Sequence, residues 1–167
     1  MRKLAFDALI SMKKSLKKPK NGDLFALQPE KDMYYFGKVI QTNLKSTDAF
    51  INGMTLIYIY SYCSTEKQIP VDLDKNELLI APVIVNNQPW VKGYFETIGN
   101  AQVSEIEKNI DFAFWNVLKE EYVDITGQVI KSNPKYCSVY GLGSYGVVGK
   151  AVQKAILEIK SVGIKSK

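Results

Sequence analysis

Three carboxylates that lie close together, Asp72, Asp74 and Glu77, form the group of side chains best suited to chemistry in this sequence. Clustered carboxylates can act in acid–base catalysis or bind calcium. A calcium loop also needs a glycine at its sharp turn and a distal glutamate, and neither follows in register here. The spacing therefore favours a short helix over residues 72–79, with Asp72 or Asp74 as its cap.

The chain contains no histidine, the side chain used most often as a general base near neutral pH and as a metal ligand. A Ser–His–Asp or Cys–His arrangement is therefore impossible. Cys63 and Cys137 do not form a CxxC pair, and both lie in apolar, strand-like runs, so we expect buried free thiols in a reducing cytosol. We expect no cofactor and no metal, and an enzyme working through carboxylates or tyrosines is the least favoured function.

Residues 141–146, with the sequence GLGSYG, match the dinucleotide-binding pattern GxGxxG between a predicted strand and a predicted helix. That fingerprint requires a second strand with an acidic residue about 20 positions later. Only a helix and a tail follow Gly146, so we interpret the segment as a glycine-rich turn that lets the last strand pass close to the closing helix.

Aromatic residues offer a second kind of site, because exposed Tyr and Trp side chains are common in protein interfaces. Tyr34 and Tyr35 are adjacent, so on a strand they point to opposite faces and one of them should be exposed. Trp90 and Tyr94 lie in a run of aromatic residues that suits a core as well as an exposed patch.

The elements that must position these residues follow an irregular order of helices and short strands. We predict an amphipathic helix over 3–18, strands near 23–28, 33–42, 54–62, 80–85, 90–98 and 136–142, a helical turn near 104–109, a hairpin over 122–130 and a closing helix over 147–159. This order differs from strict strand–helix alternation. It predicts an α+β fold with a mainly antiparallel, curved sheet, SH3-like or barrel-like, between an N-terminal and a C-terminal helix.

The length of 167 residues suits one domain over 21–167, preceded by the basic amphipathic helix within residues 1–20. The net charge is +5, but the first 20 residues hold seven cations and one anion, which leaves 15 cations and 16 anions in the remainder. We interpret the terminal lysines as a solvated face. No stretch approaches the about 20 apolar residues of a membrane span, and no signal peptide is apparent, so we expect a cytoplasmic protein.

Five segments, in this order along the chain, resemble the immunity protein 26 family of bacterial polymorphic-toxin systems. They are 22–26 (GDLFA), 35–39 (YFGKV), 89–95 (PWVKGYF), 122–127 (YVDITG) and 141–143 (GLG). The resemblance implies a non-enzymatic protein that binds a cognate toxin domain and neutralises it by covering its surface.

The surface residues that we select for such a partner are Tyr34, Tyr35, Asp72, Asp74, Glu77, Trp90, Tyr94 and Tyr145. The alternative function is a small nucleic-acid-binding domain that uses the basic N-terminal segment, although the nearly neutral remainder does not favour nucleic acid. Exposed strand edges would also allow a homodimer.

Overall fold

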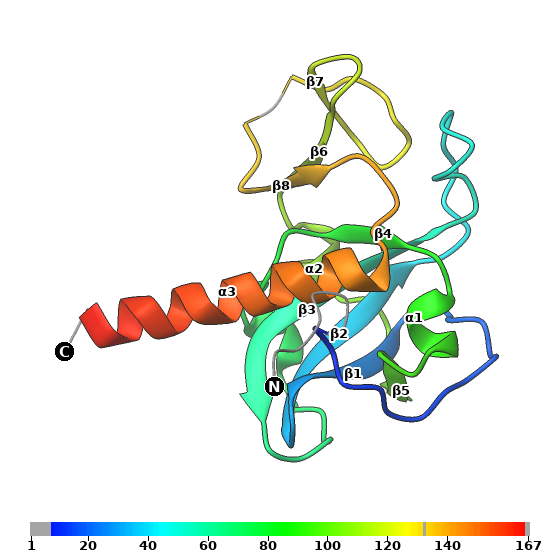
Figure 1. Ribbon diagram of the computed structural model, residues 1–167. Coiled ribbons are helices and arrows are strands. Elements are labelled where there is room, and N and C mark those ends of the chain that lie inside the picture. Colours follow the sequence, from blue (N-terminus) through cyan, green and yellow to red (C-terminus); the bar gives the residue numbers. More distant parts are fainter. Residues whose placement is uncertain (1–7, 132, 166–167) are drawn as a thin grey trace.

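Two β-sheets and one long helix make up the computed structural model, which describes residues 8–131 and 133–165 (Figure 1). The strands are β1 (Asp23–Glu30), β2 (Met33–Gln41), β3 (Thr55–Ser64), β4 (Val83–Val85), β5 (Glu96–Asn100), β6 (Phe112–Asn116), β7 (Glu121–Val123) and β8 (Tyr136–Val139). The helical elements are η1 (Leu73–Lys75), α1 (Gln88–Val91), α2 (Glu105–Lys108) and α3 (Tyr145–Lys165). The predicted α+β class is confirmed.

The larger sheet is antiparallel throughout and has the strand order β4-β3-β2-β1-β5. Its edge strands β4 and β5 do not pair with each other, so the sheet is open and the barrel-like alternative is wrong. The smaller sheet has the order β7-β6-β8, in which β8 runs parallel to β6.

Side-chain alternation along the first three strands divides the core into two sides. Even-numbered apolar residues such as Leu24, Ala26 and Phe36 belong to the cluster that includes Phe114 of β6. Odd-numbered residues such as Phe25 and Leu27 belong to the opposite cluster, which also contains Leu9, Trp90, Phe95, Val148 and Val152. A pleated strand directs successive side chains to opposite faces, so the larger sheet is covered on both sides.

Gly37 in β2 lies where neighbouring parts of the sheet leave no room for a side chain. A Cβ atom there would overlap the ring of Phe25 and lie 2.6 Å from the carbonyl oxygen of Tyr58. The ladder between β2 and β3 also shifts register between Tyr35 and Phe36. Glycine therefore lets the ring of Phe25 lie directly against the middle of the sheet.

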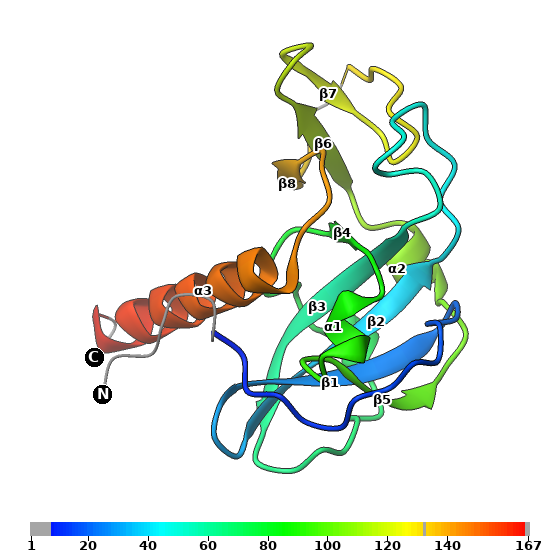
Figure 2. The ribbon, with the colours of Figure 1, turned by 45° about the vertical axis from the view of Figure 1, so that its right-hand side comes forward.

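The predicted N-terminal helix is wrong for residues 8–18, which form an irregular segment across one side of the larger sheet (Figures 1 and 2). Its backbone amides find partners far along the chain: Ile10 N donates to Gln28 O at 2.8 Å, and Met12 N donates to Gly93 O at 2.7 Å. These bonds replace the i→i−4 ladder of a helix. The first part of the predicted helix, residues 1–7, lies outside the described residues.

Several other predicted elements differ in type or length: β4 and β8 are shorter than the strands predicted over 80–85 and 136–142, and α3 is longer than the helix predicted over 147–159. Only η1 forms within residues 72–79, and the Asp72 side chain makes no capping hydrogen bond. Residues 88–91 form α1 rather than the start of a strand, since Pro89 suits the first helical turn and breaks a strand ladder. None of the helices that the structure describes is long and apolar enough to cross a membrane.

Candidate partner-binding face

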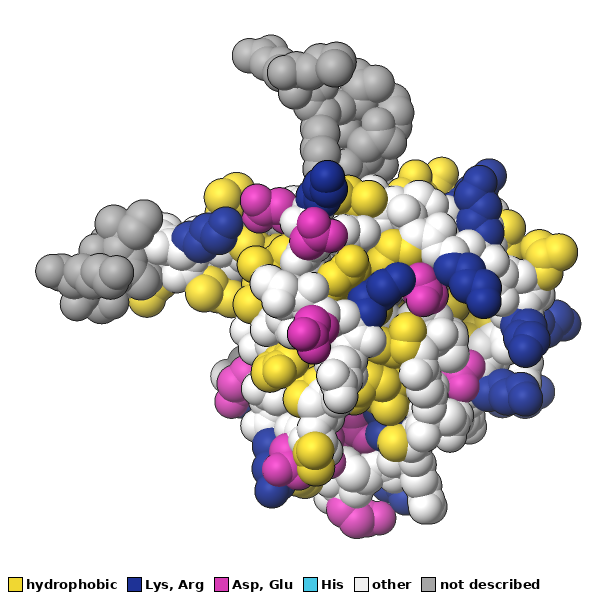
Figure 3. All heavy atoms as spheres, turned by 90° about the horizontal axis from the view of Figure 1, so that it is seen from below, with side chains coloured by type: hydrophobic (Ala, Val, Ile, Leu, Met, Phe, Trp, Pro, Cys, Tyr) yellow, Lys and Arg dark blue, Asp and Glu magenta, His cyan; other side chains and the backbone are white. Residues whose placement is uncertain are grey.

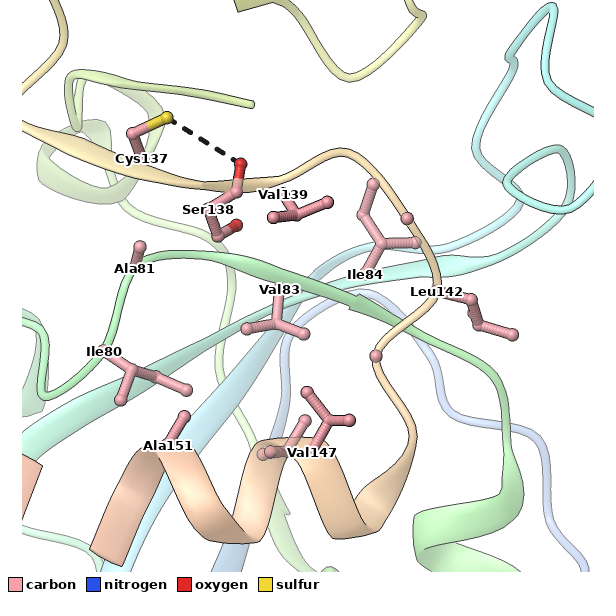
Figure 4. Close-up of a pocket in the computed structure, with 13 residues that line it drawn as sticks. Ile80, Ala81, Val83, Ile84, Cys137, Ser138, Val139, Leu142, Val147 and Ala151 are labelled. Carbon is pink, nitrogen blue, oxygen red and sulfur yellow. Dashed lines mark hydrogen bonds between the residues drawn. The ribbon is translucent and has the colours of Figure 1, made fainter. Parts of the chain in front are cut away.

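An apolar groove with a volume of about 450 Å³ lies between the β4 edge of the larger sheet, β8 and the first turns of α3 (Figure 4). Its lining is Ile80, Ala81, Val83, Ile84, Cys137, Ser138, Val139, Gly141, Leu142, Gly143, Val147, Val148 and Ala151. Val139 and Val147 are each 61% exposed, and Leu142 is 39% exposed. Contiguous exposed apolar side chains of this kind mark interaction sites.

The glycine-rich turn before α3 holds one side of this groove in place. Gly143 N donates to Ile84 O at 2.7 Å, and a Cβ atom on Gly143 would lie 2.7 Å from Val83 Cγ1. On β8, Ser138 Oγ donates to Pro82 O at 2.8 Å. The predicted turn is present, but its close contact at Gly143 is with β4 rather than with the closing helix, and residues 145–146 already belong to α3.

Two of the predicted partner-binding residues, Tyr94 and Tyr145, come together beside the groove. Their rings stack with centroids 4.8 Å apart and an interplanar angle of 25°. Both side chains are half-buried, and Val147, two residues after Tyr145, lines the groove. The stacked pair therefore joins the first turn of α3 to the loop after α1, and it lies on another side of α3 than Val147, because helix residues two apart do not share a face.

Residues 8–20, which we call the lysine arm, adjoin the same loop. Ser11 Oγ donates to Lys92 O at 2.7 Å, and Ser15 N donates to Trp90 O at 3.0 Å. Gly93, with a φ of +79°, permits this approach, because a Cβ atom there would lie 2.8 Å from Met12 O. We refer to the groove, the tyrosine pair and the lysine arm together as the groove face.

The end of the lysine arm borders a hollow of about 740 Å³. Its lining is Lys13, Ser15, Lys17, Lys18, Lys20, Asp23, Glu96 and Thr97. Figure 3 shows lysine side chains gathered along the side where the N-terminal segment runs in Figure 1. This end of the groove face is therefore basic.

The predicted acidic group lies at the other end of β8 and is balanced by lysines. Glu77 accepts hydrogen bonds from Tyr136 OH at 2.6 Å and Lys135 Nζ at 3.0 Å, and these two bonds lower the pKa of its carboxyl group. Asp72 lies 3.7 Å from Lys75 Nζ. A hollow of about 600 Å³, which Asp74 also lines, joins these residues to α2 and adjoins the groove along β8. The charge here is mixed rather than acidic.

Trp90 is in the core, so the structure does not present this side chain to a partner. It is 1% exposed and packs edge-on against Phe25 and Phe95, with ring centroids 5.5 and 5.2 Å away. Tyr35 is also buried, and burial, with a smaller effect of Cys63, raises its pKa to about 12. Tyr34 is half-buried, and Lys67 Nζ lies 5.8 Å from its ring centroid.

Both cysteine thiols are exposed, so their predicted burial is wrong. Each belongs to the last half of a strand or to an edge strand, where one side chain in two faces outward. Cys137 lines the groove, and partial burial raises the pKa of its thiol. Among the described residues, no three His, Cys, Asp or Glu side chains come together in a way that could hold a metal ion.

A buried ionic network that sequence reasoning missed lies on the other side of the larger sheet. Glu107 Oε1 accepts from Lys38 Nζ at 2.7 Å, and Glu107 Oε2 accepts from Tyr60 OH at 2.5 Å. Ser104 and Glu107 also form a capping box at the start of α2. The Ser-x-x-Glu spacing at 104–107 is the signal that could have indicated it. All these partners are internal, so the network joins α2 to the sheet.

The pKa of Tyr60 is raised by burial, by its hydrogen bond to Glu107 and by the negative charge of that carboxylate. Burial and Glu107 likewise raise the pKa of Tyr58, whose OH donates to Glu107 O at 3.1 Å. Neither phenol is therefore suited to lose a proton near neutral pH. This geometry indicates a structural network rather than an acid–base centre.

Comparison with known proteins adds one finding. The sequence profile of Imm26, immunity protein 26, matches residues 20–124. No curated protein and no solved structure shows a significant match. The matched segment contains β1 to β7, whereas β8, α3 and nearly all of the lysine arm lie outside it. Members of this family serve in polymorphic-toxin systems and are typically non-enzymatic, which supports the expectation of a binding protein. The chain belongs to the immunity protein 26 family.

Proposed function

We propose that this protein neutralises its cognate toxin domain in the cytoplasm by binding it directly through the groove face and covering the surface that the toxin needs for activity. The family supplies the class of partner. We choose this face because of the apolar groove, around which Val139, Leu142 and Val147 are exposed.

Burial of apolar surface is the main source of affinity for such a contact. Fully burying one valine or leucine side chain contributes about 1.5–3 kcal/mol. The three exposed residues lie on β8, on the turn after it and on α3, and all three line the groove, so a single partner surface can cover them together. The half-buried tyrosine pair adds amphipathic rings beside them. A stable interface needs about 800 Å² from each partner, so contacts must extend beyond the groove to these rings and the lysine arm.

A mechanism in which the protein covers the toxin surface also suits the hydrogen-bonded backbone around the groove. The backbone around the groove is held by Gly143 N to Ile84 O and by Ser138 Oγ to Pro82 O, so no large rearrangement is needed before a partner binds. Preorganisation of this kind reduces the entropic cost of association. The protein then acts by occupying the toxin surface, and no step in this mechanism requires a covalent change.

The test is co-expression with the toxin domain encoded beside its gene, combined with calorimetry on the purified pair. Wild-type protein should restore growth and bind the toxin. The double variant Val139→Asp/Val147→Asp should lose both properties, because it places two charges in the apolar contact. The matched control is Val117→Asp, since Val117 is 60% exposed in a turn between β6 and β7, away from the groove.

Circular dichroism and thermal unfolding establish whether each variant is folded. Failure of wild-type protein to bind the toxin or restore growth would overturn the proposed function. Equal protection by the wild-type protein and the folded double variant would overturn the choice of face.

A further inference from the structure

The lysine arm carries positive charges that form no ion pair within the described part of the chain. In the described residues, the ion pairs involve Lys38, Lys67, Lys75, Lys108 and Lys135. None of them involves the five lysines of the arm, which are Lys13, Lys14, Lys17, Lys18 and Lys20, and all five are exposed. The two carboxylates of the neighbouring hollow accept from backbone amides of the arm, Glu96 from Lys13 N at 3.3 Å and Asp23 from Lys20 N at 2.9 Å. Their other side-chain partners are Lys67 Nζ for Glu96 and Asn100 Nδ2 for Asp23, so neither carboxylate pairs with an ammonium group of the arm.

The backbone of the arm is held on both sides of these lysines. Met12 N and Ser15 N donate to Gly93 O and Trp90 O, and Lys20 N donates to Asp23 Oδ2 at 2.9 Å. Ordering a charged segment on binding costs conformational entropy, and here much of that cost is met on folding. The arm is therefore a prearranged basic surface rather than a free tail.

Leu16 lies in the middle of this basic surface and is 85% exposed. Its sequence neighbours are Ser15 and Lys17, with Lys14 and Lys18 one position further. An apolar side chain surrounded by cations complements a small apolar pocket with carboxylates around its rim. Protein interfaces combine a buried apolar contact with a polar rim in this way.

We propose that the lysine arm binds an acidic surface of the toxin domain and inserts Leu16 into an apolar pocket there. This inference rests on the proposed function and names the chemistry of the partner at the basic end of the groove face. The arm contacts the loop after α1 through Lys92 and Gly93, next to Tyr94. Since the family match starts at residue 20, the arm contributes to the choice of toxin rather than to the shared fold.

Other polyanions fit the arm less well. Proteins that bind single-stranded nucleic acid stack bases on aromatic side chains, and the hollow beside the arm has no aromatic residue in its lining. Binding to a membrane surface requires a broad apolar face, whereas Leu16 is a single exposed leucine among lysines. An acidic protein surface is therefore the partner that these residues favour.

The experiment compares two charge-reversed variants in toxin binding, measured by calorimetry at about 50 mM and about 300 mM salt. The arm variant is Lys13→Glu/Lys14→Glu/Lys17→Glu/Lys18→Glu. The control is Lys31→Glu/Lys45→Glu/Lys119→Glu/Lys131→Glu, which changes the net charge equally at four exposed positions elsewhere. At the lower salt we expect the arm variant to lose at least about tenfold in affinity and the control to lose much less.

Two further measurements separate this inference from the proposed function. Leu16→Ala should weaken toxin binding at both salt concentrations, because it removes apolar rather than ionic contact. If the arm variant and Leu16→Ala bind like wild type while Val139→Asp/Val147→Asp does not, the arm inference is overturned and the proposed function stands. Salt-dependent oligonucleotide binding that the arm variant loses, with toxin affinity unchanged, would also overturn the arm inference in favour of nucleic acid.

Discussion

Lys38 Nζ lies 2.7 Å from Glu107 Oε1, and the two side chains are only 5% and 1% exposed. Lys38 also donates to Gln102 O at 2.9 Å, so it bonds to both ends of the turn that leads into α2. This buried pair joins α2 to the middle strand of the larger sheet, on the side opposite to the groove face.

Replacing Lys38 with methionine should therefore destabilise the fold strongly. The Lys38→Met variant leaves the Glu107 carboxylate buried without its cation, which typically costs about 3–5 kcal/mol in the free energy of unfolding. Urea denaturation at neutral pH measures this loss. The double variant Lys38→Met/Glu107→Gln should recover part of it, because the buried charge is removed, the amide oxygen can still accept from Ser104 N, and the amide NH2 group can donate to the hydroxyl oxygen of Tyr60. A loss within the range of ordinary surface substitutions, about 0.5 kcal/mol, would contradict this role.

Alkaline pH should unfold the protein through Tyr58 and Tyr60. Their pKa values are raised in the folded state above the ordinary 10.0, so the stability that they contribute is complete below pH 10.0 and is lost as the pH rises above it. Denaturant titrations across this alkaline range should show a falling free energy of unfolding. The Tyr60→Phe variant should show a shallower fall, since one of the two phenols no longer titrates. Parallel pH profiles for the two proteins would show that the phenol of Tyr60 is not responsible.

Adding a methyl group to Gly37 should destabilise the sheet. The new Cβ atom would overlap Phe25 and the Tyr58 carbonyl oxygen, and overpacking of this kind costs about 1–3 kcal/mol. Gly141→Ala is the matched control, because a Cβ atom there meets nothing within 4 Å. Thermal unfolding should separate the two variants, and equal melting temperatures would show that the strand can move to make room.

The exposed thiols allow the groove face to be probed chemically. Both cysteines should react with a thiol reagent in the folded protein, and Cys137 should need a higher pH than an ordinary thiol because partial burial raises its pKa. In a Cys63→Ser background, alkylation of Cys137 should block toxin binding, because the added group lies in the groove. In a Cys137→Ser background, alkylation of Cys63 should leave binding unchanged. The opposite pattern would place the interface near β3.

Local periodicity was sufficient to predict the first three strands of the larger sheet. Apolar alternation at Leu24, Ala26 and Phe36 indicated strands, and the structure pairs β1 with β2 in the expected hairpin. The four-residue spacing of Leu4, Ala8, Met12 and Leu16 indicated a helix just as clearly, but Leu16 is exposed and Met12 N bonds to Gly93 O. Hydrogen bonds to residues far along the chain cannot be recognised from the periodicity of the local sequence.

The candidate site was only partly predictable for the same reason. Tyr94 and Tyr145 could be selected as aromatic residues, whereas their stacking depends on α3 returning across the larger sheet. Val139 and Val147 carried no signal, because an apolar residue in a predicted strand or helix is normally assigned to the core. The exposure of Val139 follows from the pairing of β8 with β6 alone, which places β8 at the edge of the smaller sheet.

The two walls of the groove come from different parts of the chain. β4 lies within the family-matched residues 20–124, while β8 and the first turns of α3 lie after them. A chimaera with one junction just after β7 would thus exchange β8 and α3. It would retain the five-stranded sheet, which includes β4. On the proposed mechanism, chimaeras built at this junction should change the contribution of the groove to toxin preference while the lysine arm and the larger sheet stay the same.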